Sequence, residues 1–246
     1  MTAAHLLSVV VIASVVAVEV CMHLSQDNES EIVYDRFFSR PAPHRGGFFV
    51  EAGALDGKRY SNSWFFEKCL GWCGLLIEGN PANFRDLVTN RPSAIKLHTA
   101  LCADGEEVDF IAGGGATAGA VAAMDRKFLD RWHHTTTPQI VRVPCITLAH
   151  ALCLHGITEI DFLSLDVEGS ELDVVRHIDF TRVRIRVIIV EQDRYNMTKV
   201  LEVRRLLQEQ GYSLDRLAIR RSDLFYKEPS TVRIPCRPCR SYSFSE

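Results

Sequence analysis

The sequence predicts an α/β fold, in which a mainly parallel sheet carries helices on both faces and ends in a C-terminal antiparallel hairpin. Three observations lead to this prediction. Short apolar runs alternate with segments of helical periodicity, and most of the runs are apolar throughout, as in strands buried on both faces. Acidic residues and glycines follow several of these runs. The last two extended runs are separated by only a short turn, which cannot hold a crossover helix.

The N-terminal half of the expected sheet alternates regularly between strand and helix. Ser61 or Asn62 can cap the first helix, and Gly71 ends it. Pro81 stands in the first turn of the second helix, where its missing N–H group costs nothing. The expected elements are strands over residues 48–52, 75–77 and 94–102 and helices over residues 61–70 and 81–90.

An insertion over residues 103–144 interrupts the alternation, which then resumes. The strand-like runs 108–112 and 139–145 are joined through a Gly-rich loop that begins at Gly113. Gly211 is a natural C-cap for the last helix. The elements expected after the insertion are helices over residues 147–154, 170–177 and 198–210, strands over 160–165 and 185–190, and hairpin strands over 212–219 and 223–227.

The chain divides into an apolar N-terminus, a polar linker, one folded domain and a tail. No Asp, Glu, Lys or Arg occurs from Thr2 to Val18, and the length of this apolar run falls between a signal-peptide core and a membrane span. We therefore expect a secretory-pathway protein that is either anchored in the membrane by this segment or secreted. The regions are the apolar signal or anchor 1–24, the linker 25–46, the domain 47–228 and the tail 229–246.

Charge and cysteine content bear on the class of partner. The hydrophobic fraction of 47% is ordinary for a globular domain, and the net charge of −3 offers no electrostatic argument for nucleic acid. Cys236 and Cys239 have C-x-x-C spacing without further metal ligands, which favours a disulfide or free thiols over zinc. The remaining cysteines of apolar segments are expected to be small buried hydrophobes, and they are Cys69, Cys73, Cys102, Cys145 and Cys153.

The first chemical motif is a glycine turn that follows the first expected strand. Gly53 and Gly57 allow a tight turn and a close approach of ligand to backbone, at the strand end where open parallel sheets bind ligands. Glu51 would repel a pyrophosphate but would suit the cationic amino group of S-adenosylmethionine. The spacing is not G-x-G-x-x-G, which disfavours an NAD-type oxidoreductase. A glycine turn without any ligand is the alternative interpretation.

Further carboxylates follow the later strands. Glu78 lies 27 residues after Glu51, about one strand–helix–strand unit, and an acid at this position can bind both hydroxyls of a ribose. Asp166 and Glu168 come after the fourth strand and could serve as a general base, a cofactor contact or ligands of a divalent metal. Alternatively, Asp166 caps the loop, and Glu168 or its neighbour Glu171 complements a helix N-terminus. Glu191 repeats the pattern after the fifth strand, with both interpretations open.

In combination these segments resemble the FkbM-type methyltransferases. The resemblance runs from about Phe48 to Tyr226 and rests on Phe49–Gly57, Leu76–Pro81 and Ile160–Glu171 together with shorter pieces between and after them. It implies a Rossmann-like methyltransferase fold, S-adenosylmethionine as methyl donor, and O-methylation of a hydroxyl. We expect no metal. The expected catalytic residues are Asp166 and Glu168, and the expected cofactor-binding residues are Glu51, Gly53, Asp56, Gly57, Asn62, Glu78, Asn80 and Asp166.

Two departures from the family pattern bear on function. Glu51 stands where family members more often have Asp, and Gly79 stands where they commonly have Pro. The apolar N-terminus is similar to that of membrane-anchored animal members, some of which act in trafficking without catalysis. The expected function is thus methylation of a hydroxyl on a small molecule or glycan. The alternative is a membrane-tethered, catalytically inactive protein of the same fold that acts in binding or trafficking.

Overall fold

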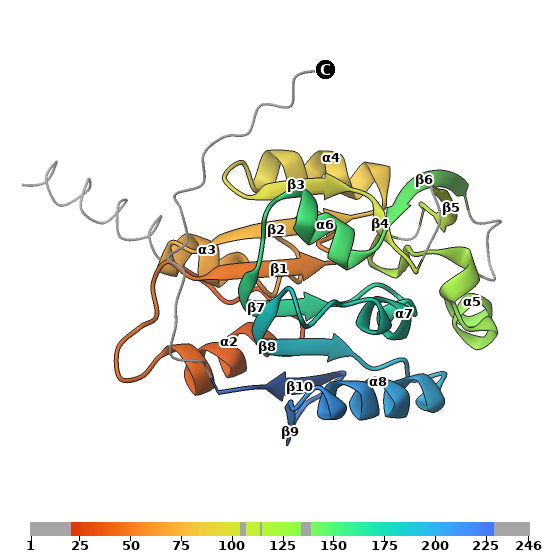
Figure 1. The fold of residues 1–246 in the computed structure, drawn as a ribbon. Coiled ribbons are helices and arrows are strands. Elements are labelled where there is room, and N and C mark those ends of the chain that lie inside the picture. Colours follow the sequence, from red (N-terminus) through yellow and green to blue (C-terminus); the bar gives the residue numbers. More distant parts are fainter. Residues whose placement is uncertain (1–20, 104–106, 114, 134–138, 229–246) are drawn as a thin grey trace, which may run out of the picture.

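The structure, a computed structural model, describes residues 21–103, 107–113, 115–133 and 139–228 (Figure 1). Most of the expected signal or anchor 1–24 lies outside these residues, as does the tail 229–246 with its C-x-x-C cysteines. Among the helices of the described part, none has the length and apolar character needed to cross a membrane.

The main sheet has seven strands in the order β3-β2-β1-β7-β8-β10-β9. The first five strands in this order are parallel, whereas β10 runs antiparallel to both of its neighbours. This arrangement confirms the expected Rossmann-like fold with a C-terminal hairpin. The strands are β1 (Phe48–Ala52), β2 (Cys73–Glu78), β3 (Ile95–His98), β7 (Glu159–Leu165), β8 (Arg184–Glu191), β9 (Ser213–Ile219) and β10 (Ser222–Tyr226).

Helices cover both faces of this sheet (Figure 1). Side chains alternate along each strand, so that Val50 of β1 packs in the core on one face and Phe49 in the core on the other. One face is covered by α6 (Leu148–Leu154), α7 (Glu171–Arg176) and α8 (Met197–Glu209), and the other by α2 (Glu29–Val33), α3 (Trp64–Leu70) and α4 (Pro81–Asn90).

The register of the strands brings their carboxyl ends to one edge. Ala52 of β1 pairs with both Ile77 of β2 and Leu165 of β7, and Leu165 pairs in turn with Val190 of β8. The residues that follow this row, which include three acids, therefore come next to one another. Strand order reverses at β1, and such a switch point is where open α/β sheets bind their ligands.

The insertion forms a second, smaller sheet instead of an irregular loop. The single strand expected over residues 94–102 is two strands, β3 in the main sheet and β4 (Ala100–Leu101) in the small one. β4 runs parallel to β6 (Ile140–Ile146), which pairs antiparallel with β5 (Glu107–Ile111). Between β5 and β6 lie the 3-10 turns η2 (Gly115–Thr117) and η3 (Val121–Ala123) and the helix α5 (Arg126–Trp132), which we did not predict.

The expected linker over residues 25–46 is wrong in its central part. Residues 29–38 form α2 and the π-helix η1 (Tyr34–Phe38). Val33 and Phe38 are buried against the main sheet, and the apolar side chains of Ile32, Tyr34 and Phe37 pack against the same core. The folded unit therefore begins well before Phe48.

The interpretation of the cysteines as buried hydrophobes also needs correction. Cys102 and Cys145 form a disulfide that joins the end of β4 to β6, and Cys73 is disulfide-bonded as well. Cys153 is exposed at the end of α6, and Cys69 is half-buried. Apolar neighbours in the sequence did not distinguish these environments, because pairing depends on contacts between distant segments.

Candidate active site

A cavity of about 850 Å³ opens at the carboxyl edge of the main sheet. Its walls come from the loops after β1, β2, β7 and β8, from α5, and from Gln26 and Arg221 at the two ends of the chain's folded part. The arrowheads of these strands point toward the side of the molecule where α5 lies (Figure 1). A volume of this size is typical of small-molecule and cofactor sites.

The glycine turn after β1 brings two neighbouring strands close together. Gly53 has φ +80°, and a Cβ there would lie 1.7 Å from the backbone oxygen of Asp166, so only glycine fits. Gly53 lines the cavity, whereas Gly57 packs away from it against Leu87 and Arg91. Asp56 does not line the cavity either, because its Oδ1 accepts the backbone N–H groups of the two residues after Gly57 and so shapes the turn.

The carboxylate of Glu51 is held by the start of the next helix. It accepts hydrogen bonds from Ser61 Oγ (2.9 Å), Ser63 Oγ (2.5 Å) and the backbone N–H of Asn62 (2.7 Å). The fully buried guanidinium of Arg91 donates to both serine hydroxyls from behind. Burial raises the pKa of Glu51, against which Arg91 and these hydrogen bonds act. Glu51 lines the cavity, but the hydrogen bonds of its carboxylate mainly hold the segment that carries Asn62 in place.

Asn62 presents an unused acceptor at the cavity wall. Its Nδ2 donates to Ser164 Oγ at 3.0 Å, and this bond fixes the direction of the amide. Its Oδ1 is buried and has no hydrogen-bond partner in the described residues. A buried acceptor without a partner is costly unless a ligand supplies the donor. An ammonium group, such as the amino group of an amino-acid ligand, has the required chemistry.

Glu78 lies at the end of β2 and lines the cavity. Its Oε2 accepts from the N–H of Leu55 (2.8 Å) and its Oε1 from the N–H of Asn80 (2.7 Å). Burial raises its pKa to about 7. Each carboxylate oxygen can accept a further hydrogen bond, as the two hydroxyls of a ribose require. Asn80 does not line the cavity, because its side chain caps α4 at Ala82 and donates to the backbone of Ala112.

Three acids at the ends of β7 and β8 meet in the cavity, and we call Asp166, Glu168 and Glu191 the carboxyl cluster. One oxygen of each lies within 4.8 Å of the other two, a spacing that could hold a divalent cation as well as a shared proton. Burial raises the pKa of all three, to about 9 for Glu168, and the charge of Asp166 adds to the rise in the pKa of Glu168 and of Glu191. The cluster places both expected catalytic residues beside Glu191, whose role the sequence leaves open.

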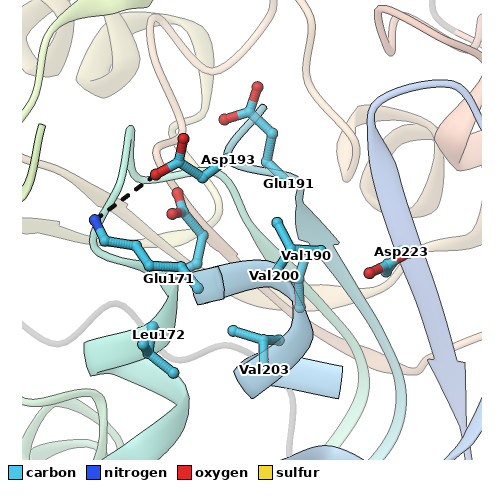
Figure 2. A pocket seen from close by; sticks show the side chains of 9 residues that line it. Glu171, Leu172, Val190, Glu191, Asp193, Val200, Val203 and Asp223 are labelled. Atoms are coloured by element: carbon cyan, nitrogen blue, oxygen red, sulfur yellow. Dashed lines mark ion pairs between the residues drawn. The ribbon is translucent and has the colours of Figure 1, made fainter. Parts of the chain in front are cut away.

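The loop between β7 and α7 positions Glu168 at a conformational cost. Glu168 has φ +53°, a left-handed conformation that is rare for a residue with a side chain and is often found at functional sites. The buried Glu171 accepts the backbone N–H groups of Val167 and Gly169 and so holds this loop. Glu171 therefore has the helix-start role considered for it from the sequence. In Figure 2 the dashed line marks the ion pair between Asp193 and Lys199, and Glu171 is labelled below it.

Positive charge reaches the cavity from side chains that sequence reasoning missed. Arg221, in the turn of the hairpin, pairs with Asp27 at 2.5 Å. Burial raises the pKa of Asp166, and the charge of Arg221 opposes that rise. Each of the chain's Arg-Tyr and Arg-Trp dipeptides also lines the cavity, and these are Arg59-Tyr60, Arg131-Trp132 and Arg194-Tyr195. Their repetition in the sequence is the signal that could have identified them.

The fold and the cavity define a class of protein. A parallel sheet with its switch point at β1, a glycine turn after that strand and an acid after the next are the features of a Rossmann-like site for a ribose-containing cofactor. Residues 51–214, more than half of the chain, match the methyltransferase FkbM domain. The protein therefore belongs to the FkbM methyltransferase family, and S-adenosylmethionine is the methyl donor of this class.

Several solved methyltransferases have similar structures. An FkbM methyltransferase from Methylobacillus flagellatus has a TM-score of 0.46 at 11% identity, with 74% of this chain and 44% of that one covered. The METTL16 methyltransferase domain has a TM-score of 0.46 at 14% identity, with coverage of 81% and 66%. Fibrillarin from Aeropyrum pernix, in complex with S-adenosyl-L-methionine, has 0.39 at 14%, with coverage of 74% and 66%. No curated protein matches the sequence.

Proposed function

We propose that this protein transfers the methyl group of S-adenosylmethionine to a hydroxyl oxygen of a small molecule or glycan. The observation that carries the proposal is the carboxyl cluster, which lies in the same cavity as the glycine turn and Glu78. In the reaction the bond from sulfur to the methyl carbon breaks and a bond from oxygen to that carbon forms. The hydroxyl proton passes to a carboxylate of the protein.

The residues of the β1 and β2 loops suit the cofactor. The unpartnered Oδ1 of Asn62 would accept from its ammonium group, and Gly53 leaves the backbone open to close approach. Glu78 would hold the ribose hydroxyls through the free acceptor sites of its two oxygens. When bound, the cofactor supplies an electrophilic methyl group. The carboxyl groups on the cavity floor add attraction for its positive charge.

Asp166 is the group best suited to take the hydroxyl proton. Glu168, with a pKa raised to about 9, is protonated at neutral pH and would act as a hydrogen-bond donor. Burial also raises the pKa of Asp166, but a hydrogen bond from Glu191 and the charge of Arg221 act in the opposite direction. Asp166 is therefore the member of the cluster whose charged form has stabilising partners, and we assign it the role of base.

Calorimetry with S-adenosylmethionine tests the cofactor site. We expect wild-type protein to bind it, and Glu78→Gln to bind it about tenfold or more weakly, because one charge-assisted acceptor is lost. Asp86→Asn is the matched control, since Asp86 is exposed on α4 and lies outside the cavity lining. Absence of binding by wild-type protein at millimolar concentration would contradict the proposal. Binding without methyl transfer to any hydroxylated acceptor would instead favour the tethered, inactive alternative.

We also propose that the apolar N-terminus directs the chain into the secretory pathway, as an anchor or a cleaved signal. The chain has two glycosylation sequons, Asn28-Glu-Ser30 and Asn196-Met-Thr198, and a glycan on either would mark passage through the secretory pathway. Asn28 is exposed at the start of α2, whereas the side chain of Asn196 caps α8 by accepting from Lys199. Cell fractionation with glycosidase treatment should therefore show a glycan at Asn28 that Asn28→Gln removes. A cytosolic, unglycosylated protein would refute this localisation.

A further inference from the structure

The wall of the cavity formed by α5 and the loop after β8 has an unusual composition. Two of the three Arg-Tyr and Arg-Trp dipeptides lie here, and Phe128 of α5 packs edge-to-face on Tyr195 with ring centroids 5.9 Å apart. We call Phe128, Arg131, Trp132, Arg194 and Tyr195 the aromatic–arginine wall. The guanidinium carbon of Arg131 lies 5.4 Å from the centroid of the Trp132 ring. A positive charge and an aromatic ring therefore lie next to each other on this wall of the cavity.

Trp132 is too exposed for a residue that serves the core. Its side chain is large and apolar, yet 51% of the residue is exposed. An exposed aromatic residue that lines a cavity usually marks a contact with a ligand. A flat ring face, of a sugar or of an aromatic compound, is the surface that packs best on an indole. The guanidinium beside it is suited to carboxylate, sulfate or phosphate.

The charges of the cavity are arranged in two layers. The floor holds the carboxyl cluster, which is largely shielded from solvent, and Arg131 and Arg194 are exposed at the mouth. An anionic group would be repelled by the floor and attracted to the mouth. A neutral hydroxyl has no such difficulty near Asp166. A ligand with an acidic group at one end and a hydroxyl at the other would therefore lie in one orientation.

The cofactor does not account for this wall. Asn62, Gly53 and Glu78, which suit the cofactor, belong to the loops after β1 and β2. The aromatic–arginine wall belongs instead to the insertion and to the loop after β8. The third dipeptide, Arg59-Tyr60, lies on the loop after β1 and is therefore not part of the aromatic–arginine wall.

We propose that the methyl acceptor is an acidic ring compound. Its ring stacks on Trp132, its anionic group pairs with Arg131 and Arg194, and its hydroxyl points to Asp166. This inference rests on the proposed function and specifies the acceptor class. Acidic sugars and aromatic hydroxy acids share the chemistry, and the experiment separates them by using a matched pair of each kind.

The test measures binding and methyl transfer with the full chain loaded with S-adenosylhomocysteine or S-adenosylmethionine. The probes are methyl glucuronide against methyl glucoside, and 4-hydroxybenzoate against 4-hydroxybenzyl alcohol. We expect the acidic member of at least one pair to bind about tenfold more tightly than its neutral partner. The pair that shows the preference identifies the source of the ring. Methyl transfer should show the same preference in kcat/KM.

Variants distinguish the wall from general charge effects. Arg131→Gln and Trp132→Ala should each weaken binding of the acidic probe about tenfold or more, with affinity for S-adenosylmethionine unchanged. Arg126→Gln is the control, because Arg126 is exposed on the same helix but does not line the cavity. Equal binding of acidic and neutral probes, no binding of any probe by the cofactor-loaded protein, or equal effects of Arg126→Gln and Arg131→Gln would overturn the inference. Failure of wild-type protein to bind S-adenosylmethionine would overturn the proposed function instead.

Discussion

The close approach of β1 and β7 depends on a single glycine. Gly53 needs both a left-handed backbone and the absence of a Cβ, because the backbone oxygen of Asp166 occupies that space. Gly46 has a similar φ, +70°, but no atom lies within 4 Å of where its Cβ would be. Alanine variants of the two glycines therefore separate the free-energy cost of the left-handed backbone from the free-energy cost of the steric clash.

We predict that Gly53→Ala is much more damaging than Gly46→Ala. The control should lower the free energy of unfolding by only about 1 kcal/mol, the cost of a left-handed backbone for alanine. Gly53→Ala should add a steric clash of several kcal/mol or force β1 and β7 apart, with loss of S-adenosylmethionine binding. Chemical denaturation and calorimetry measure both effects. Similar stabilities of the two variants would contradict the geometry described for Gly53.

A second prediction at the residue scale concerns pH. Burial raises the pKa of Asp166 and Arg221 opposes the rise, so Arg221→Gln should raise that pKa further. A base must be deprotonated to act, so the acidic limb of the kcat profile should move to higher pH. Arg221→Lys, which keeps the charge, should restore the limb. An unchanged profile in Arg221→Gln would show that Asp166 is not the base.

The N-terminal segment is the element whose behaviour differs most from expectation. Phe38 of η1 is 1% exposed and packs edge-to-face against Trp72 and Phe66, with ring centroids 4.8 and 5.8 Å away. Phe38→Ala should therefore destabilise the protein by about 3 kcal/mol or more, as large-to-small changes in a core do. Met22→Ala, at a residue 47% exposed, should be nearly neutral. Denaturant titration measures both, and a neutral Phe38→Ala would restore the interpretation of this segment as a linker.

Local signals explain which elements could be predicted. The prediction of a helix over residues 81–90 is confirmed at both ends, and Pro81 in its first turn is the local signal that marks its start. The helix predicted from residue 61 begins at Trp64, whose backbone N–H donates to Ser61 Oγ, while the hydroxyls of Ser61 and Ser63 donate to Glu51. The bonds to Glu51 involve a strand ten residues away and are invisible to periodicity.

The same distinction applies to the site. Acids after successive strands predicted that Glu78 and Asp166 would share one edge, since parallel strands end together. The sequence did not reveal that Asn80 would be consumed by α4 and Ala112, or that Asp56 would shape its own turn. The donors to Asp56 and to Asn80 Oδ1 are backbone N–H groups two or three residues away, and only the acceptor of Asn80 Nδ2, the carbonyl of Ala112, lies in a distant segment. Asn and Asp are the residue types expected both in such turns and caps and in contact with a ligand, so the sequence alone does not separate the two roles.

For the molecule as a whole, the buried acids make stability depend on pH in an unusual direction. Burial raises the pKa of Glu78 and Glu171 to about 7 and of Glu168 to about 9. Their ordinary value is 4.5, which we take for the unfolded chain. Between these values the folded protein binds more protons than the unfolded chain, so the free energy of unfolding falls as pH rises. The loss begins near pH 4.5 and continues through pH 7 to 9.

We therefore predict that the cofactor-free protein is more stable at pH 5.5 than at pH 8.5. For Glu78 alone the loss is on the order of 2 kcal/mol between pH 5.5 and pH 8.5, because part of the rise in its pKa from 4.5 to about 7 lies below this window. Glu78→Gln, which cannot ionise at this position, should reduce the dependence by the contribution of Glu78, whereas Glu209→Gln, at an exposed residue of α8, should leave it unchanged. Denaturant titrations at the two pH values provide the measurement. Since S-adenosylmethionine brings positive charge to the same cavity, its binding should stabilise the protein more at pH 8.5 than at pH 5.5. A protein equally stable at both pH values would show that these carboxyls remain solvated, and the case for a proton-holding cluster beside the methyl acceptor would fail with it.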